Sequence, residues 1–249
     1  MFAGLAWFLL ALVPLVFLQR LLHREIQAVF LITTRHPGVT VGLFSMLFFP
    51  GVLLHELSHF LVAKILGVRT GGFSLLPQVL PDGRLILGYV ETQRTDVIRD
   101  SLIGLAPLVA GGLFIAYASI YKLDLLLLWQ TFQNGQVDLF LRALSALPSV
   151  NDFPLWFYLT FAVSSTMLPS ASDRHAWTPL AVWIVSILAL AIFAGAGPWM
   201  SAVVAPPLNS FLQSVAMLFG LSAAVHAILV LPTFLIHKFV ARVFKVDIV

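Results

Sequence analysis

Residues Val39–Gly67 read VTVGLFSMLFFPGVLLHELSHFLVAKILG. The stretch is apolar for three turns before the motif His55-Glu56-Leu57-Ser58-His59 and mostly apolar for two turns after it. A run of this length and character predicts a helix that crosses a bilayer. Ionisable side chains are expensive at membrane depth, so three of them within five residues indicate a functional site on this helix.

The motif has the HExxH spacing of zinc hydrolases. Histidines at positions i and i+4 share one helix face, so both imidazoles can reach one metal ion. The intervening Glu56 lies close enough to act on a water molecule at that ion. The structural alternative is a pair of buried histidines bonded to helix carbonyls, with Glu56 paired nearby. Burying these groups without a metal is costly, which disfavours that alternative.

The composition is that of a polytopic membrane protein. The chain is 60% hydrophobic and 10% charged, with a mean hydropathy of +0.99, and a soluble domain of 249 residues could not keep so much apolar surface from water. There is no cysteine, which excludes disulfides and thiolate zinc sites, so a zinc ion would need His, Asp or Glu. The net charge of +3 concerns membrane topology and predicts no nucleic-acid partner.

The sequence predicts an all-α membrane protein with about six spans in a single domain, residues 1–249. The first span opens apolar without a basic leader region, so it is expected to be a retained helix. The segment 122–151 is mixed and predicts an interfacial helix or an extramembrane excursion. The six spans are Phe2 to about Leu18, Val39–Gly67, about Ser101–Tyr121, about Phe153–Leu168, about Pro179–Ala196 and about Leu208–Phe239.

A small β-hairpin is expected directly after the motif helix. The turn signal Pro81-Asp82-Gly83 separates two apolar-rich arms, Phe73–Leu80 and Arg84–Val90. Pro77 indicates an edge or interrupted strand. An open sheet edge cannot face lipid, so the hairpin must lie in protein, in a water-filled cleft or at the surface.

A catalytic zinc ion usually has three protein ligands, and the motif supplies two. Asp173 ends the short fourth span on the side toward which the motif helix runs, which makes it the favoured third ligand. His175 is two residues away and is an alternative. His226 lies well inside an apolar span, where a bond to a neighbouring helix is the more common role.

Basic residues predict the orientation. With the end of the motif helix on side A, nine Lys and Arg fall on side A and five on side B. Side A holds Lys64, Arg69, Arg84, Arg94, Arg99, Arg174, Lys238, Arg242 and Lys245, and side B holds Arg20, Arg24, Arg35, Lys122 and Arg142. The positive-inside rule then makes side A cytoplasmic, which predicts a multi-pass protein with its active site nearer the cytoplasmic face.

These residues resemble the site-2 proteases, a family of intramembrane zinc metalloproteases. The resemblance covers about residues 39–175. It rests on HELSH with the following FLVAKILGV, on GLAPLVAG at 104–111, and on Pro169 followed by Asp173. The chain departs from the family pattern at Thr166, where the family has Asn, in a Pro-to-Asp spacing shorter by one residue, and at Arg174, where the family has Gly.

The resemblance implies an intramembrane zinc metalloprotease that cleaves transmembrane protein or peptide substrates in the lipid bilayer. Zn²⁺ would be held by His55, His59 and Asp173. Glu56 would be the general base, and the Thr166 hydroxyl would be a candidate donor to the oxyanion. An extended substrate could add as a strand to the edge of the hairpin.

Two other readings compete with this one. A membrane zinc-binding protein without proteolysis, such as a transporter or a metal sensor, also places His and Asp at membrane depth. A carrier needs no general base between two ligands, so Glu56 favours hydrolysis. A different HExxH protease family would take a downstream Glu as third ligand, but Glu25 and Glu91 are the other glutamates and neither lies in a later apolar span.

Overall fold

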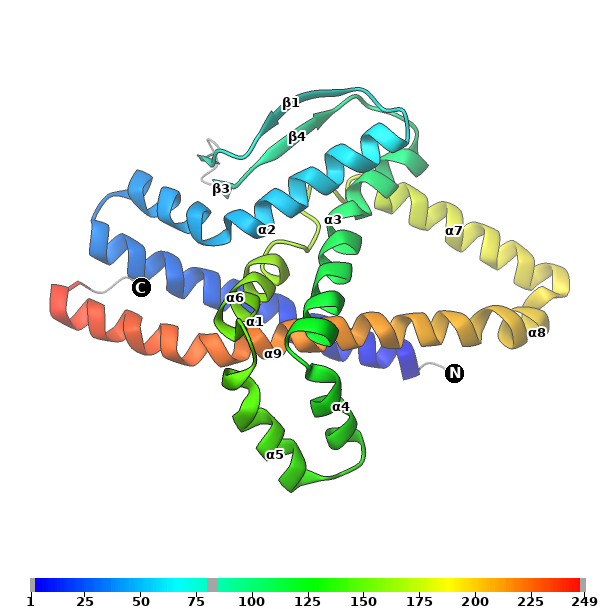
Figure 1. The fold of residues 1–249 in the computed structure, drawn as a ribbon. Helices are drawn as coiled ribbons and strands as arrows, with labels where there is room; N and C mark the ends of the chain where they lie inside the picture. Colours follow the sequence, from blue (N-terminus) through cyan, green and yellow to red (C-terminus); the bar gives the residue numbers. More distant parts are fainter. Residues whose placement is uncertain (1–2, 80–84, 247–249) are drawn as a thin grey trace.

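The computed structural model describes residues 3–79 and 85–246, which are mostly α-helical (Figure 1). Four described segments are long and apolar enough to cross a membrane: Ala3–Thr34, Pro37–Ile65, Val97–Lys122 and Trp177–Phe244. The expected helical class is confirmed. The expected count of about six spans is not confirmed, because the fourth predicted span forms a helix of only 12 residues and the fifth and sixth lie within the single helical segment Trp177–Phe244.

The elements follow one another with short connections. The α-helices are α1 (Ala3–Thr34), α2 (Pro37–Ile65), α3 (Val97–Tyr117), α4 (Leu125–Gln133), α5 (Val137–Ala146), α6 (Phe153–Ser164), α7 (Trp177–Ala191), α8 (Gly197–Trp199) and α9 (Ala205–Phe244). Short π-helical turns at Ala118–Lys122, Ile192–Ala196 and Met200–Val204 and a 3-10 turn at Leu147–Ser149 extend or join them. The mixed segment of the sequence is the α4–α5 helical hairpin beyond the far end of α3 (Figure 1).

Local signals in the sequence explain where the two site-bearing helices begin. α2 begins at Pro37, where proline occupies the first turn and the His36 ring accepts a hydrogen bond from the Val39 amide. α3 begins after Asp96, whose carboxylate accepts hydrogen bonds from the amides of Ile98 and Arg99. α2 is followed by Gly67, whose φ of +70° suits glycine.

The predicted β-hairpin is present between α2 and α3 and lies along α2 (Figure 1). β1 (Thr70–Ser74) pairs antiparallel with β4 (Tyr89–Thr92), and β2 (Gln78–Val79) pairs antiparallel with β3 (Leu85–Ile86). The first arm is interrupted around Pro77, as expected of a residue that cannot donate to the ladder. The predicted turn at 81–83 lies outside the described residues.

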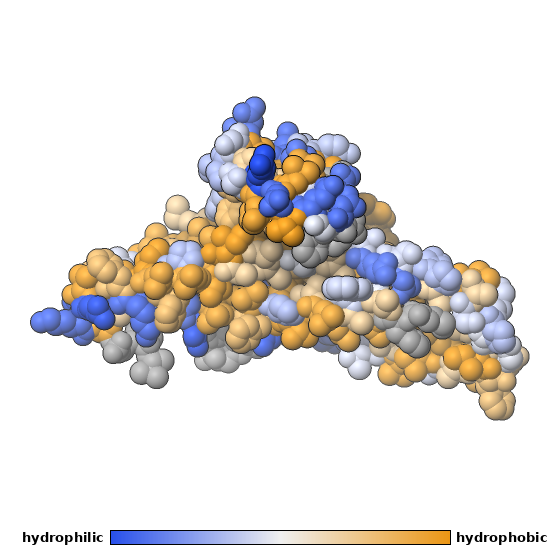
Figure 2. Space-filling model, turned by 90° about the horizontal axis from the view of Figure 1, so that it is seen from below, coloured by the Kyte–Doolittle hydropathy of each residue, from blue (hydrophilic) through white to orange (hydrophobic). Residues whose placement is uncertain are grey.

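α6 is short because it ends inside the molecule. Residues 160–165 at its C-terminal end are all buried, between α1, α2, α3 and α9. Phe161 packs into a cluster with Phe48 of α2 and Val225 of α9. Many outer faces are apolar and exposed, as a bilayer would require, and hydrophobic side chains cover much of the face shown in Figure 2.

α1 and α9 run parallel, and this corrects the sequence-based topology. The Gly4 amide donates to Asn209 at the start of α9, over 2.7 Å. Further along, His237 Nδ1 lies 2.6 Å from the Glu25 carboxylate, and the Arg35 guanidinium lies 5.6 Å from the Phe244 ring. The C-terminal end of α9 therefore lies beside Arg35, although the sequence-based topology placed the two on opposite sides.

This correction changes the charge count that set the orientation. Lys238, Arg242 and Lys245 move from side A to side B with Arg35, so nine against five becomes six against eight. The positive-inside rule then no longer places the motif helix end at the cytoplasmic face.

Candidate metal centre

The two motif histidines point their Nε2 atoms at one spot. They lie one turn apart on α2, with ring centroids 4.8 Å apart and Nε2 atoms 3.2 Å apart. His59 is buried and His55 nearly so, with 13% of its side chain exposed. The helix itself sets this spacing, as the sequence predicted.

Two backbone carbonyls from outside α2 orient the rings, one just beyond the end of α6 and one within α3. His55 Nδ1 lies 2.6 Å from the Thr166 carbonyl oxygen, and His59 Nδ1 lies 2.8 Å from the Ile103 carbonyl oxygen. A carbonyl only accepts, so each Nδ1 carries a proton and each Nε2 of a neutral ring presents a lone pair. This is how metal-binding histidines are held in the correct tautomer.

Both carbonyls are free for a reason that is visible in the sequence. Thr166 lies just beyond the C-terminal end of α6, where carbonyls lack a partner within the helix. Ile103 lies four residues before Pro107 in α3, and proline has no N–H to donate to it. The end of one helix and a proline in another thus supply the two acceptors.

Asp173 completes the cluster from the loop between α6 and α7. Its carboxylate oxygens lie 3.3 Å from His59 Nε2 and 3.6 Å from His55 Nε2. The Ser170 amide donates to the same carboxylate over 2.6 Å. Burial opposes ionisation, yet the neighbouring His55 and His59 rings and the Ser170 amide hold the pKa of Asp173 well below its usual range. The carboxylate is therefore ionised at neutral pH.

The donor set fits a tetrahedral transition-metal ion. Ligand atoms bonded at about 2.0–2.1 Å to a tetrahedral ion lie about 3.3–3.4 Å apart. Here the two Nε2 atoms lie 3.2 Å apart, Asp173 Oδ1 lies 3.3 Å from His59 Nε2, and Asp173 Oδ2 lies 3.6 Å from His55 Nε2, so each contact is close to that spacing. Two imidazoles and one carboxylate suit zinc and related divalent metals. Among the residues that the structure describes, His55, His59 and Asp173 form the one group of His, Cys, Asp or Glu that could hold a metal ion.

Two glycines allow the close backbone approaches that bring the metal-binding residues together. A Cβ at Gly104 of α3 would overlap the carbonyl of Asp173. A Cβ at Gly51 of α2 would overlap the Ala162 carbonyl and the Thr166 hydroxyl. Only glycine lets the Asp173 loop and the end of α6 come this near to α2 and α3.

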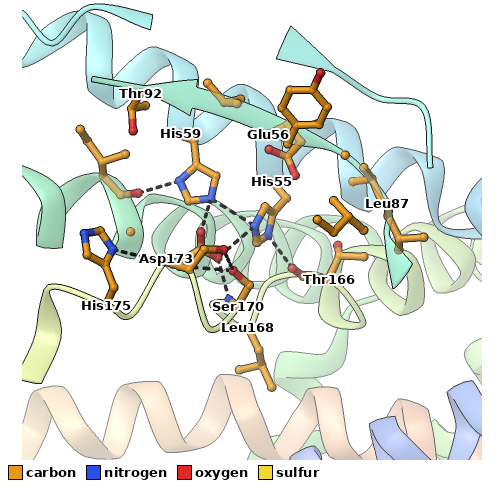
Figure 3. A pocket seen from close by; sticks show the side chains of 18 of the residues that line it. His55, Glu56, His59, Leu87, Thr92, Thr166, Leu168, Ser170, Asp173 and His175 are labelled. Carbon is orange, nitrogen blue, oxygen red and sulfur yellow. Dashed lines mark hydrogen bonds and ion pairs between the residues drawn. The ribbon is translucent and has the colours of Figure 1, made fainter. Parts of the chain in front are cut away.

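Glu56 lies beside the cluster and outside the ligand group. It is buried, with 7% of the residue exposed, and it lines the same cavity as the two histidines. Gly88, between β3 and β4 of the hairpin, packs against it, since a Cβ there would lie 2.9 Å from Glu56 Cγ. Glu56 thus faces the hairpin, whereas Asp173 comes from the loop between α6 and α7 (Figure 3).

The cluster opens into a cavity of about 720 Å³. One wall is the hairpin segment 86–90 with Thr92, and the opposite wall is the segment from Ser165 to His175 (Figure 3). A polypeptide strand could lie in a space of this size between the hairpin and the two histidines.

The other candidates from the sequence have different roles. His175 Nδ1 bonds the Ser172 carbonyl over 2.7 Å, and its Nε2 lies 3.4 Å from Asp100. His226 bonds Ser165 and is fully buried away from the cluster, as its more common role predicted. The Thr166 hydroxyl donates to the Ala162 carbonyl over 3.1 Å, so it is engaged within α6 rather than free for an oxyanion.

Sequence reasoning missed the residues that support the cluster. Gly51, Gly104 and Pro107 position it through backbone approach and a freed carbonyl, and Ser170 holds the Asp173 carboxylate. Small residues and a proline in the motif helix α2 and in the following helix α3 were the available signal. A search with models of known protein families, against curated proteins and against solved structures found no match to this chain.

Proposed function

We propose that the protein is an intramembrane zinc metalloprotease that hydrolyses peptide bonds of transmembrane substrates. The observation that supports this most strongly is the convergence of two Nε2 lone pairs and an ionised carboxylate, with Glu56 beside them and outside the ligand group. Lone pairs and a negative charge at 3.2–3.6 Å from one another call for a cation between them.

In this proposal His55, His59 and Asp173 hold Zn²⁺, which supplies Lewis acidity toward a carbonyl oxygen and a water molecule. The Glu56 carboxylate takes the proton of the attacking water and later delivers it to the leaving amine. Burial of Glu56 beside the hairpin keeps that carboxylate close to the scissile bond. The carbonyls of Thr166 and Ile103 keep both rings oriented while the substrate is bound.

The hairpin offers a place for the substrate. β4 forms part of the cavity wall, at Tyr89, Val90 and Thr92. A transmembrane helix hides its amides in its own ladder and must unwind before it can be cut. An unwound segment that adds along β4 would exchange helix hydrogen bonds for sheet hydrogen bonds while facing the histidines.

The parallel alignment of α1 with α9 favours an odd number of membrane crossings over the six that hydropathy predicts.

Replacing Glu56 by Gln tests the proposal. The purified variant should still bind one zinc ion per chain, because Glu56 is a base and not a ligand. It should lose about 10²–10⁴-fold of its activity, the usual contribution of a general acid–base group. Activity is measured on unfolded casein in detergent, which needs no unwinding, and on synthetic transmembrane peptides, with new termini identified by mass spectrometry. Asp138→Asn, on the exposed face of α5, is the control.

The outcomes separate the possibilities. Zinc bound with no cleavage by the unaltered protein would favour the alternative of a transporter or metal sensor. Cleavage by Glu56→Gln at the rate of the unaltered protein would remove the hydrolytic mechanism. Failure to bind zinc would remove both.

A further inference from the structure

Thr166, just beyond the end of α6, is the residue whose carbonyl orients the His55 ring. Thr166 offers its carbonyl to His55 Nδ1, and the residue before it, Ser165, is 3% exposed. The position of the Thr166 carbonyl therefore depends on what fixes Ser165. Two side chains from outside the HExxH helix contact that residue, one from α9 and one from α1.

His226 of α9 holds the Ser165 side chain. It is fully buried, and its Nδ1 lies 2.7 Å from the Ser222 carbonyl oxygen of its own helix. A carbonyl only accepts, so Nδ1 carries the proton and Nε2 is the acceptor of the neutral ring. The Ser165 hydroxyl, 3.0 Å from Nε2, must therefore donate to His226. Both nitrogens of the His226 ring are hydrogen-bonded, and the Ser165 hydroxyl is the donor in the bond to Nε2.

Gln19 of α1 holds the Ser165 backbone. Its side-chain amide donates to the Ser165 carbonyl, which lies at the helix end and has lost its partner within α6. Two consecutive carbonyls at this helix end are thus satisfied by side chains of other helices, Ser165 by Gln19 and Thr166 by His55. Ser165 is held at its hydroxyl and at its carbonyl.

We propose that Gln19 and His226 are positioning residues of the metal centre, which act by clamping Ser165 and so aim the Thr166 carbonyl at His55. Through these contacts the orientation of the His55 ring depends on α1 and α9, although neither helix supplies a metal ligand. This inference rests on the metal centre of the proposed function and is independent of the proteolytic chemistry.

A matched pair of variants at one position tests it. In His226→Gln the side-chain carbonyl reaches about as far as Nε2 and can accept the Ser165 hydroxyl. In His226→Asn the side chain ends near the position of Nδ1 and cannot reach Ser165. Both variants are small and polar, so they differ mainly in the bond to Ser165. Ser165→Ala removes the same bond from the other side, and Gln19→Leu removes the bond to the carbonyl.

The measurements are Co²⁺ affinity and the visible absorption spectrum of bound Co²⁺, which reports ligand geometry. Thermal unfolding of the metal-free protein is followed in parallel. We expect His226→Asn, Ser165→Ala and Gln19→Leu to weaken Co²⁺ binding about 10-fold, the lower end of the effect of outer-shell partners, and to alter the spectrum. His226→Gln should restore both. Ser165→Ala combined with His226→Asn should be no worse than either alone.

Two results would overturn the inference. One is unchanged Co²⁺ affinity and spectrum in His226→Asn. The other is that His226→Asn and His226→Gln lose the same Co²⁺ affinity and the same thermal stability. His226 would then act through packing and not through its bond to Ser165. If the unaltered protein bound no Co²⁺, the proposed metal centre itself would fail, which is a different outcome from either.

Discussion

Gly104 sets how near the third ligand comes to the two histidines. A Cβ at this position would overlap the carbonyl of Asp173, and a backbone atom cannot yield as a flexible side chain can. Gly104→Ala should therefore push the Asp173 loop outward and weaken zinc affinity by about 10-fold or more, as other losses of ligand support do. Competition with a chromophoric chelator measures this affinity in the metal-stripped protein.

Gly112→Ala is the matched control for Gly104→Ala. It makes the same change in the same helix, but its new Cβ would meet only Leu218 Cδ1 at 3.5 Å, an ordinary contact. Zinc affinity should be unchanged there. Equal affinities in the two variants would mean that the Asp173 loop does not depend on this close approach.

At the scale of residues, the sequence was informative where chemistry is local. His55, Glu56 and His59 follow from a spacing within one helix, so they could be found without knowing any neighbour. The distant Asp173 could be favoured only through a topology argument, and the structure brings it to the cluster. The supporting carbonyl of Thr166 had no local pattern, because nothing in the sequence states which helix end faces His55.

At the scale of helices, Pro107 is the device that frees the Ile103 carbonyl for His59. Pro107→Ala restores an N–H that would compete for this carbonyl and removes a residue unfavourable inside a helix. We expect thermal stability to be maintained or raised while zinc affinity falls about 10-fold. Scanning calorimetry or a fluorescence melt reports the first quantity, and chelator competition reports the second.

Pro232→Ala in α9 is the comparison for Pro107→Ala, because it removes another proline within a helix, and that proline is exposed. Zinc affinity should not change in that variant. If Pro107→Ala also kept its full zinc affinity, the missing N–H would not be what prepares the Ile103 carbonyl for His59.

The elements that the sequence predicted well are those with local signals. The hairpin was foreseen from its turn residues and alternating arms, and the helix carrying the motif from its length and apolarity. Span boundaries were predicted less well. The fourth span was expected to cross the membrane as far as Leu168, yet α6 has 12 residues and extends only about 18 Å, which is less than the hydrocarbon core of a bilayer. Apolarity alone did not distinguish a crossing helix from a shorter one.

At the scale of the whole molecule, the pairing of α1 with α9 could not be read from hydropathy, since both helices are apolar on most sides. The buried Glu25–His237 contact, with Arg24 also bonded to Glu25, fixes their parallel alignment. A buried polar contact of this kind is better at specifying a register than at adding stability. Glu25 lies beyond the first predicted span and His237 lies inside the sixth, so their partnership could be recognised only once the helices were placed.

Because α1 and α9 run parallel, the C-terminal end of α9 should lie on the opposite side of the membrane from where six crossings would place it. If α1, α2 and α3 cross, α9 starts on the side of the Asp173 loop and ends on the side of the α4–α5 hairpin, so α7 and α8 leave and return on one side. The chain has no cysteine, so a variant with one introduced cysteine is labelled at that position alone. With a membrane-impermeant maleimide on oriented vesicles, Lys245→Cys should react from the same side as Gln136→Cys and from the side opposite Gln93→Cys. Six crossings require the reverse, with Lys245→Cys labelled together with Gln93→Cys. The side on which Gln93→Cys reacts also fixes which face of the membrane the metal centre is nearer, a question that six basic residues against eight leave open.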